Sequence, residues 1–140
     1  MALTGSCFCG RIAYEVRGPL RDARSCHCSR CRKAFSAQAS AYALVETGTF
    51  SWIDGEDLLT SFVGDDGVGL QFCSVCGSTL CGVVDGKVHG ITLGCLNEDP
   101  GLQLRLHLFV GSKAAWETLP HDADCHDAFP PGWVQLNETT

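Results

Sequence analysis

Residues 73–77 read Cys73-Ser74-Val75-Cys76-Gly77, and this short stretch decides the fold. Two thiolates three residues apart can bind one metal ion while backbone amides of the turn donate hydrogen bonds to the sulfurs. Tetrahedral zinc needs two further ligands, and Cys7-Phe8-Cys9-Gly10 supplies a matching pair that also ends in glycine. The spacing therefore predicts a structural zinc on Cys7, Cys9, Cys73 and Cys76. The alternative is four buried cysteines that act only as small apolar residues.

A second cluster, Cys26-His27-Cys28-Ser29-Arg30-Cys31, carries three sulfurs in six residues. Three protein ligands and an open fourth position are typical of a catalytic zinc, because substrate or water must occupy the vacancy. His27 is an alternative fourth ligand, but both of its neighbours already bind, so its side chain should point away from the same metal. The other alternative is a second structural zinc, completed by a distant cysteine such as Cys81, Cys95 or Cys125.

Basic residues surround the third cysteine of this cluster. Arg30, Arg32 and Lys33 form the densest group of positive charge in the chain. Such a group would stabilise thiolates and could hold an anionic ligand near the metal. It is equally consistent with a solvated surface.

Composition limits the class of protein. The chain has 140 residues, 45% hydrophobic and 19% charged, with a formal net charge of −6, which suits one acidic globular domain and disfavours nucleic acid as a partner. The sequence shows no basic and apolar leader and no apolar run of membrane-spanning length, so we expect a cytoplasmic protein without a membrane partner. In that reducing compartment, ten cysteines favour metal over disulfides.

Hydrophobic patterning predicts a mainly β protein. Asp85-Gly86 between two apolar runs favours a type I′ turn, and hence a hairpin over residues 80–93. Alternation of apolar and polar residues predicts further strands, and the pair on either side of residues 46–48 is expected to form a second hairpin. These strands are expected at residues 11–17, 41–45, 49–53 and 102–108.

Little helix is expected. Short helical segments are predicted over residues 29–34, after Cys28, and over residues 112–116, where Ser112 can cap the first turn. After residue 119 the chain becomes polar and rich in proline. We therefore expect one domain over residues 1–119, and an irregular tail over residues 120–140 that packs on it or trails from it.

Three ordered motifs make the chain resemble the glutathione-dependent formaldehyde-activating enzyme family, which includes the domain of centromere protein V. The motifs are Gly5-Ser6-Cys7-Phe8-Cys9-Gly10, Cys26-His27-Cys28-Ser29-Arg30-Cys31-Arg32-Lys33 and Phe72-Cys73-Ser74-Val75-Cys76-Gly77. The resemblance also extends through Gly94-Cys95-Leu96 and Leu106-His107-Leu108-Phe109-Val110 to Trp116, and so covers about residues 3 to 119.

The resemblance implies a β-tent of antiparallel sheets, stapled by the structural zinc. It implies a second, catalytic zinc on Cys26, Cys28 and Cys31, and a carbon–sulfur lyase that joins glutathione and formaldehyde into S-hydroxymethylglutathione. Glutathione would then be a co-substrate, with Arg30, Arg32 or Lys33 receiving one of its carboxylates.

Two other classes of function compete with a zinc enzyme that acts on a small thiol and an aldehyde. One is a noncatalytic, zinc-stabilised binding module, which would have a closed second metal site. The other is a redox or metal-buffering protein that uses extra thiols such as Cys95 or Cys125.

Overall fold

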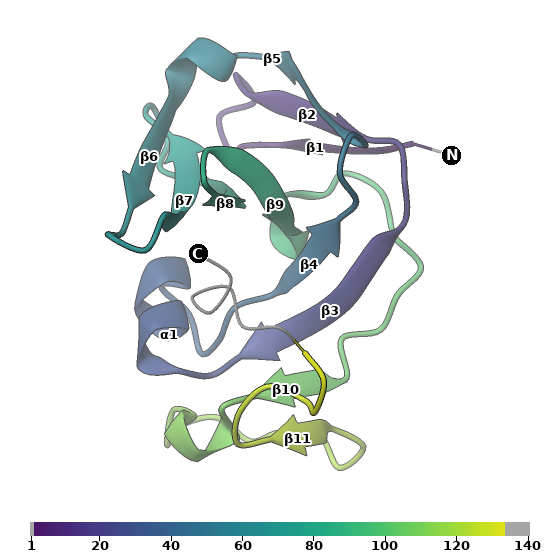
Figure 1. The fold of residues 1–140 in the computed structure, drawn as a ribbon, viewed down its shortest axis with the longest axis vertical. Coiled ribbons are helices and arrows are strands. Elements are labelled where there is room, and N and C mark those ends of the chain that lie inside the picture. Colours follow the sequence, from purple (N-terminus) through teal and green to yellow (C-terminus); the bar gives the residue numbers. More distant parts are fainter. Residues whose placement is uncertain (1, 134–140) are drawn as a thin grey trace.

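The computed structural model describes residues 2–133, which form two β-sheets and one short α-helix (Figure 1). The small sheet has the order β1-β2-β5, and the large sheet has the order β11-β10-β3-β4-β9-β8-β7-β6. In Figure 1 the small sheet lies at one end of the strongly curved large sheet, and the helix α1 (Ser29–Phe35) lies beside the concave face. The strands are β1 (Leu3–Ser6), β2 (Ala13–Val16), β3 (Leu20–Cys26), β4 (Tyr42–Val45), β5 (Phe50–Asp54), β6 (Leu59–Val63), β7 (Val68–Cys73), β8 (Thr79–Val84), β9 (Lys87–Thr92), β10 (Leu106–Leu108) and β11 (Asp124–His126).

The mainly β prediction is confirmed, and so is the hairpin with the clearest turn signal. β8 and β9 pair in antiparallel register, with Val84 opposite Lys87. Asp85 and Gly86 between them both have positive φ, 51° and 80°. Positive φ at both central residues is what a type I′ turn requires, and this turn follows the right-handed twist of the strands.

The predicted hairpin over residues 41–53 is wrong. Its two strands exist as β4 and β5, but β4 pairs with β3 and β9, whereas β5 pairs with β2 in the small sheet. The turn at Glu46-Thr47-Gly48 therefore carries the chain from one sheet to the other. Alternation indicated which face of each strand is buried, but it carries no information about the pairing partner.

Two further elements differ from expectation in the second half of the chain. Of the strand predicted over residues 102–108, only β10 forms, and its pairings with β3 and β11 are parallel rather than antiparallel. The helix expected over residues 112–116 is replaced by a 3-10 turn at Val110–Ser112. Since β10 reaches β3 only after a long crossover, the chain can approach that strand in parallel direction.

The segment expected as an irregular tail contains the strand β11, which pairs with β10 and so packs on the large sheet. Its last seven residues, 134–140, lie outside the described part of the chain. Within residues 2–133, no helix has the length and apolar character needed to cross a bilayer.

The core lies where the small sheet packs against the large one. Its largest fully buried side chains include Tyr14 and Ile12 from the small sheet side, and Leu80 and Ile91 from the large sheet. Cys7 and Cys73 belong to the same buried cluster. The packing of the two sheets therefore brings together the two cysteine motifs that lie more than 60 residues apart in sequence.

Candidate metal centres

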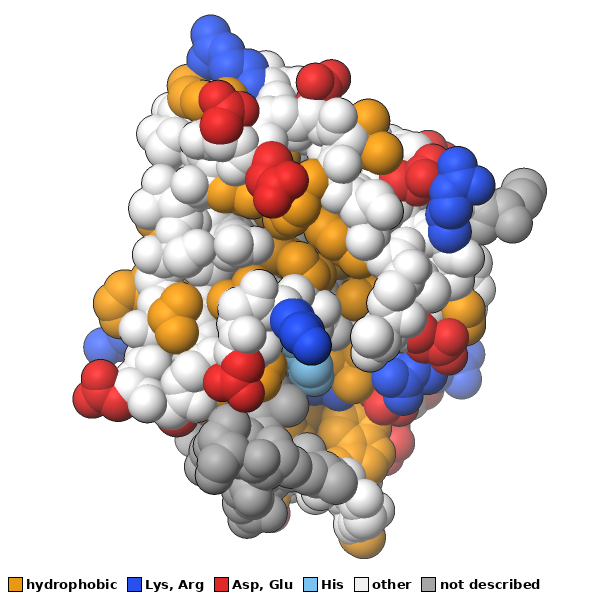
Figure 2. Space-filling view, turned by 45° about the horizontal axis from the view of Figure 1, so that its top comes forward, with side chains coloured by type: hydrophobic (Ala, Val, Ile, Leu, Met, Phe, Trp, Pro, Cys, Tyr) orange, Lys and Arg blue, Asp and Glu red, His pale blue; other side chains and the backbone are white. Residues whose placement is uncertain are grey.

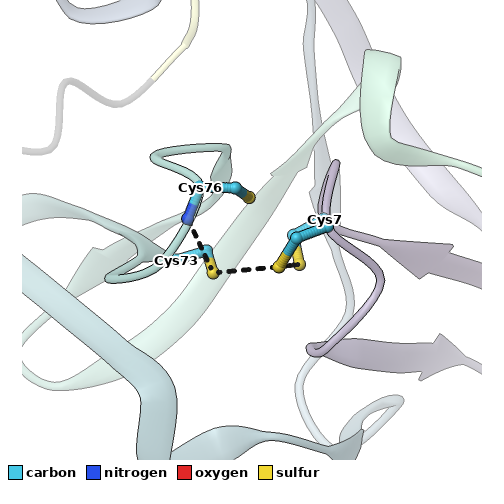
Figure 3. Close-up of side chains that lie close together, drawn as sticks. Cys7, Cys73 and Cys76 are labelled. Carbon is cyan, nitrogen blue, oxygen red and sulfur yellow. Dashed lines mark hydrogen bonds between the residues drawn. The ribbon is translucent and has the colours of Figure 1, made fainter.

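Four cysteine sulfurs converge at the junction of the two sheets (Figure 3). In Figure 3 the side chains of Cys73 and Cys76 approach from one turn, and Cys7 approaches from the opposite side. The sulfurs of Cys7 and Cys9 are 3.6 Å apart, and those of Cys9 and Cys73 are 3.8 Å apart. Tetrahedral zinc with Zn–S bonds of about 2.3 Å separates its sulfurs by about 3.8 Å. The donors therefore fit this metal in type, number and spacing.

The turns around this first cluster direct hydrogen bonds at the sulfurs. The backbone amide of Ile12 donates to Cys7 Sγ at 3.4 Å, and those of Val75 and Cys76 donate to Cys73 Sγ at 3.4 and 3.5 Å. Each knuckle closes on a glycine with positive φ, Gly10 or Gly77. Amide donors stabilise negative charge on sulfur, so both knuckles are prepared for thiolate ligands.

Ser78 links the two knuckles of the first cluster. Its Oγ accepts a hydrogen bond from the Phe8 amide at 2.8 Å and lies 3.3 Å from Cys76 Sγ. Because the oxygen accepts from Phe8, its own proton is available to the sulfur. Hydrogen bonding by Ser78 is the largest cause that lowers the pKa of Cys76 to about 5.

The second cluster is built from the end of β3 and the start of α1. Cys26 is the last residue of β3, Cys28 caps the helix and Cys31 lies in its first turn. The three sulfurs lie within 4.8 Å of one another, and the Cys28 thiol accepts a hydrogen bond from the Cys31 amide at 3.4 Å. A hydrogen bond from Cys31 is the largest cause that lowers the pKa of Cys26 to about 6.

No fourth protein ligand joins this second cluster within residues 2–133. The cysteines that sequence left open as completing ligands lie elsewhere: Cys81 donates to Gln71 Oε1, Cys95 donates to the carbonyl of Thr79, and Cys125 is exposed on β11. The cluster thus offers three thiol groups and an open fourth position, the donor set that accepts zinc with an exchangeable ligand.

His27 turns away from the second cluster into the protein interior. It is fully buried, with its Nε2 2.8 Å from His107 Nδ1 and its Nδ1 3.2 Å from Glu117 Oε1. His107, on β10, is also buried, and its ring stacks on that of His27 with the ring centres 5.1 Å apart. The contacts tie the loop between Cys26 and Cys28 to the segment after β10, a link that no local sequence signal could have revealed.

A cavity of about 180 Å³ opens beside the second cluster, on the concave face of the large sheet. Its lining is mainly apolar and includes residues of β4, β7, β8 and β9 together with Phe35 and Phe129. Figure 2 shows apolar side chains gathered in the middle of one face of the molecule, with charged side chains spread around it. The polar groups that reach the cavity wall include Cys26, Cys31, Arg24, Tyr42 and His89.

The cavity does not include the basic residues that sequence singled out. Arg30 and Lys33 are exposed on α1, and Arg32 donates from Nε to the carbonyl of His27 at 3.3 Å. The basic side chain at the cavity is Arg24 instead, two residues before Cys26 on β3. Side chains two residues apart lie on the same face of a strand, so a strand prediction for β3 would have placed Arg24 beside Cys26.

Comparisons with known proteins identify the family of the chain. A family model described as glutathione-dependent formaldehyde-activating enzyme matches residues 2–112, a span that contains all seven clustered cysteines. Among solved structures, a crystal structure of a Rhodobacter sphaeroides protein has 25% sequence identity and a TM-score of 0.52, and the match covers 71% of this chain and 90% of that chain.

No curated protein matches the chain significantly. The family match nevertheless spans well over half of the sequence and includes both cysteine clusters. The chain belongs to the glutathione-dependent formaldehyde-activating enzyme family.

Proposed function

We propose that this protein is a zinc-dependent enzyme of the carbon–sulfur lyase type, which forms or cleaves the adduct of a small thiol and an aldehyde such as formaldehyde. The observation that carries the proposal is the second cluster: three convergent sulfurs beside a cavity, with no fourth protein ligand among the described residues. A closed site would suit the noncatalytic binding module better. Cys26, Cys28 and Cys31 would hold this zinc, and Cys7, Cys9, Cys73 and Cys76 would hold a structural one.

The reaction is balanced without any further reactant. In the forward direction the thiol sulfur bonds to the aldehyde carbon, the carbon–oxygen π bond breaks, and the thiol proton ends on the oxygen. Zinc at the open site would supply Lewis acidity, which lowers the pKa of a thiol and polarises a carbonyl. Glutathione is the thiol of the family's type reaction, and the proposal includes it among the thiols to be tested.

Two side chains of the cavity can transfer the proton that the reaction moves from the thiol to the aldehyde oxygen. The Tyr42 hydroxyl lies 3.3 Å from His89 Nδ1, and both side chains line the cavity. Burial raises the pKa of Tyr42, which keeps the phenol protonated and able to donate to an oxygen. Burial also lowers the pKa of His89, which keeps the imidazole neutral. A neutral imidazole can accept the thiol proton at one ring nitrogen while its other ring nitrogen returns a proton to Tyr42, so the thiol proton replaces the one that Tyr42 donates. We assign Tyr42 as the proton donor to the aldehyde oxygen.

The apolar lining serves the same chemistry by excluding water. A thiol and an aldehyde held together in a small cavity react as one molecule, which can replace much of the entropic part of the barrier. The proposal places the protein in a reducing compartment such as the cytoplasm, because zinc binding needs reduced thiolates.

The test is the zinc content of protein purified anaerobically without chelator, followed by formaldehyde-dependent thiol consumption. We expect two zinc ions per chain. Mild chelation should remove one of them together with the activity, and added zinc should restore both, because an open site binds metal less tightly than a four-thiolate site. Catalysis that is unchanged after loss of the weaker zinc would refute the proposal.

A further inference from the structure

We infer that the cavity beside Cys26 and Cys31 binds a small thiol that carries a carboxylate, and that Arg24 binds this carboxylate. The inference rests on the proposed function and narrows its substrate class. It also assigns carboxylate binding to Arg24, which lies at the cavity, rather than to the basic residues of α1.

Arg24 is a half-buried cation without an acidic partner. Its Nε donates to the backbone carbonyl of Asp22 at 2.6 Å, and within residues 2–133 no carboxylate lies within ion-pair distance of its guanidinium. Of the ten lysines and arginines, Arg17, Arg21 and Arg105 form ion pairs within the described residues, so what distinguishes Arg24 is its half-buried place at the cavity. Buried cations are normally paired, so the unpaired edge of the guanidinium is suited to an anionic ligand.

The guanidinium lies near two aromatic rings. Its central carbon lies 5.9 Å from the centre of the Tyr42 ring and 4.7 Å from the centre of the Trp133 ring. Cation–π contacts of this kind help to orient a guanidinium and restrict its motion. A cation fixed in this way loses little conformational entropy when it binds a carboxylate.

Tyr42 is fixed in turn by two glycines. Gly82 and Gly90 lie opposite each other on β8 and β9, and a Cβ at either position would overlap the Tyr42 side chain. The Tyr42 ring therefore occupies space that a side chain at either glycine would fill. The two glycines thus allow the position of Tyr42, and through the aromatic contact that of Arg24.

The volume of the cavity limits the ligand. Sites for drug-sized ligands have volumes of about 300 to 1,000 Å³, whereas this one has about 180 Å³. The thiol has to lie near Cys26 and Cys31, and Arg24 lies on the same strand only two residues from Cys26. Both requirements favour a thiol with its carboxylate a few bonds away, and they disfavour a tripeptide.

Equilibrium binding to the two-zinc protein tests the inference. The probes are 3-mercaptopropionate, its neutral methyl ester and glutathione, each measured by isothermal titration calorimetry, with zinc content checked after each titration. We expect the acid to bind roughly tenfold to a hundredfold more tightly than the ester, as a charge-assisted hydrogen-bonded pair predicts. Arg24→Gln should abolish this preference, and glutathione should bind more weakly than 3-mercaptopropionate.

The matched control is Arg21→Gln, which removes an exposed arginine from the same strand and should leave the preference unchanged. If Arg24→Gln loses the second zinc, Arg24→Lys takes its place in the test. Lysine keeps the positive charge but cannot make the bidentate hydrogen bonds of a guanidinium, so the preference for the acid over the ester should fall while the zinc content stays full.

The outcomes separate this inference from the proposed function. Equal binding of acid and ester by the wild type, a preference that survives in the Arg24 variant with full zinc, or tighter binding of glutathione would overturn the inference alone. If the two-zinc protein binds none of the thiols, the proposed function fails and the inference fails with it.

Discussion

Two tyrosines show how differently single hydroxyl groups are used in this protein. Tyr14 is 1% exposed in the core, stacks with Phe50, and its hydroxyl has no hydrogen-bond partner within the described residues. Tyr42 lies at the cavity, and its hydroxyl is hydrogen-bonded to His89. The Tyr14 hydroxyl is therefore expected to reduce stability, because it is buried without a partner, whereas the Tyr42 hydroxyl is positioned to donate a proton.

Replacing each tyrosine with phenylalanine should separate these roles. Tyr42→Phe should lower kcat by about a hundredfold or more, the usual contribution of a positioned general acid, with little change in zinc content. Tyr14→Phe should leave kcat unchanged and hold or raise the free energy of unfolding by up to about 1 kcal/mol, because it removes a buried group without a partner. Steady-state kinetics and urea unfolding of both variants provide the measurement, and a Tyr42→Phe enzyme with full kcat would exclude Tyr42 as the proton donor.

At the scale of elements, alternation and turn signals identified several strands correctly but did not determine how they pair. β8 and β9 were predictable because Asp85-Gly86 specifies a local turn. β3 reads Leu-Arg-Asp-Ala-Arg-Ser-Cys, which has neither the alternation nor the β-branched residues of a strand. It forms because β4 and β10 pair with it on both sides, a tertiary effect that local propensity does not contain.

The strand β1 shows how an edge is protected in this fold. Its outer edge is covered by the segment around Leu96, which forms an isolated bridge with Gly5, and the Asn97 amide donates to the Thr4 carbonyl at 2.9 Å. Glu98 completes the cover: its carboxylate accepts from both the amide and the hydroxyl of Thr4 at 2.6 Å. Covering an edge in this way removes a site for unwanted strand pairing.

The Glu98 contact predicts a specific pH dependence of stability. Hydrogen bonds from Thr4 hold the pKa of Glu98 below its ordinary value of 4.5. A carboxylate whose pKa is lowered by folding adds stability above its unfolded pKa, and that stability is lost as the pH falls through the folded value. Glu98→Gln should therefore melt below the wild type at pH 6, and the difference should shrink between about pH 5 and pH 3.

Thermal unfolding of both proteins across this range checks the prediction. The control is Glu56→Gln on an exposed turn, because the Glu56 side chain makes no hydrogen bond or ion pair within residues 2–133. A wild-type advantage that stays constant down to pH 3 would show that the Glu98 carboxylate does not contribute in this way.

At the scale of the whole molecule, the two cysteine clusters were the most predictable part of the site. Cysteines at ligand spacing come in local groups, so Cys26, Cys28 and Cys31 could be assigned to one cluster without knowledge of the fold. Arg24 and His89 could not, because curvature of the large sheet brings their strands to one cavity. The dense basic cluster on α1 predicted an anion site near the second cysteine cluster, but the density of charge in sequence does not determine which side of a helix faces the cavity.

The positions of the two clusters in the fold predict different consequences when each is broken. The first cluster joins the turn after β1 to the turn after β7, and Cys7 and Cys73 are part of the core. The second lies within one strand end and one helix turn. Structural zinc contributes roughly 10 kcal/mol or more, which is comparable with the total stability of about 5 to 15 kcal/mol of a typical domain.

Cys73→Ser should therefore abolish the cooperative thermal transition, whereas Cys31→Ser should stay folded, retain one zinc ion and lose activity. Circular dichroism melting and zinc analysis of the two variants, with exposed Cys125→Ser as the control, measure the contrast. If Cys73→Ser melted as cooperatively as the wild type, packing of the two sheets would hold the fold without the first metal. If Cys31→Ser unfolded as well, the second cluster would have to be structural, because a metal held within one short segment can determine global stability only when the rest of the sheet depends on that segment.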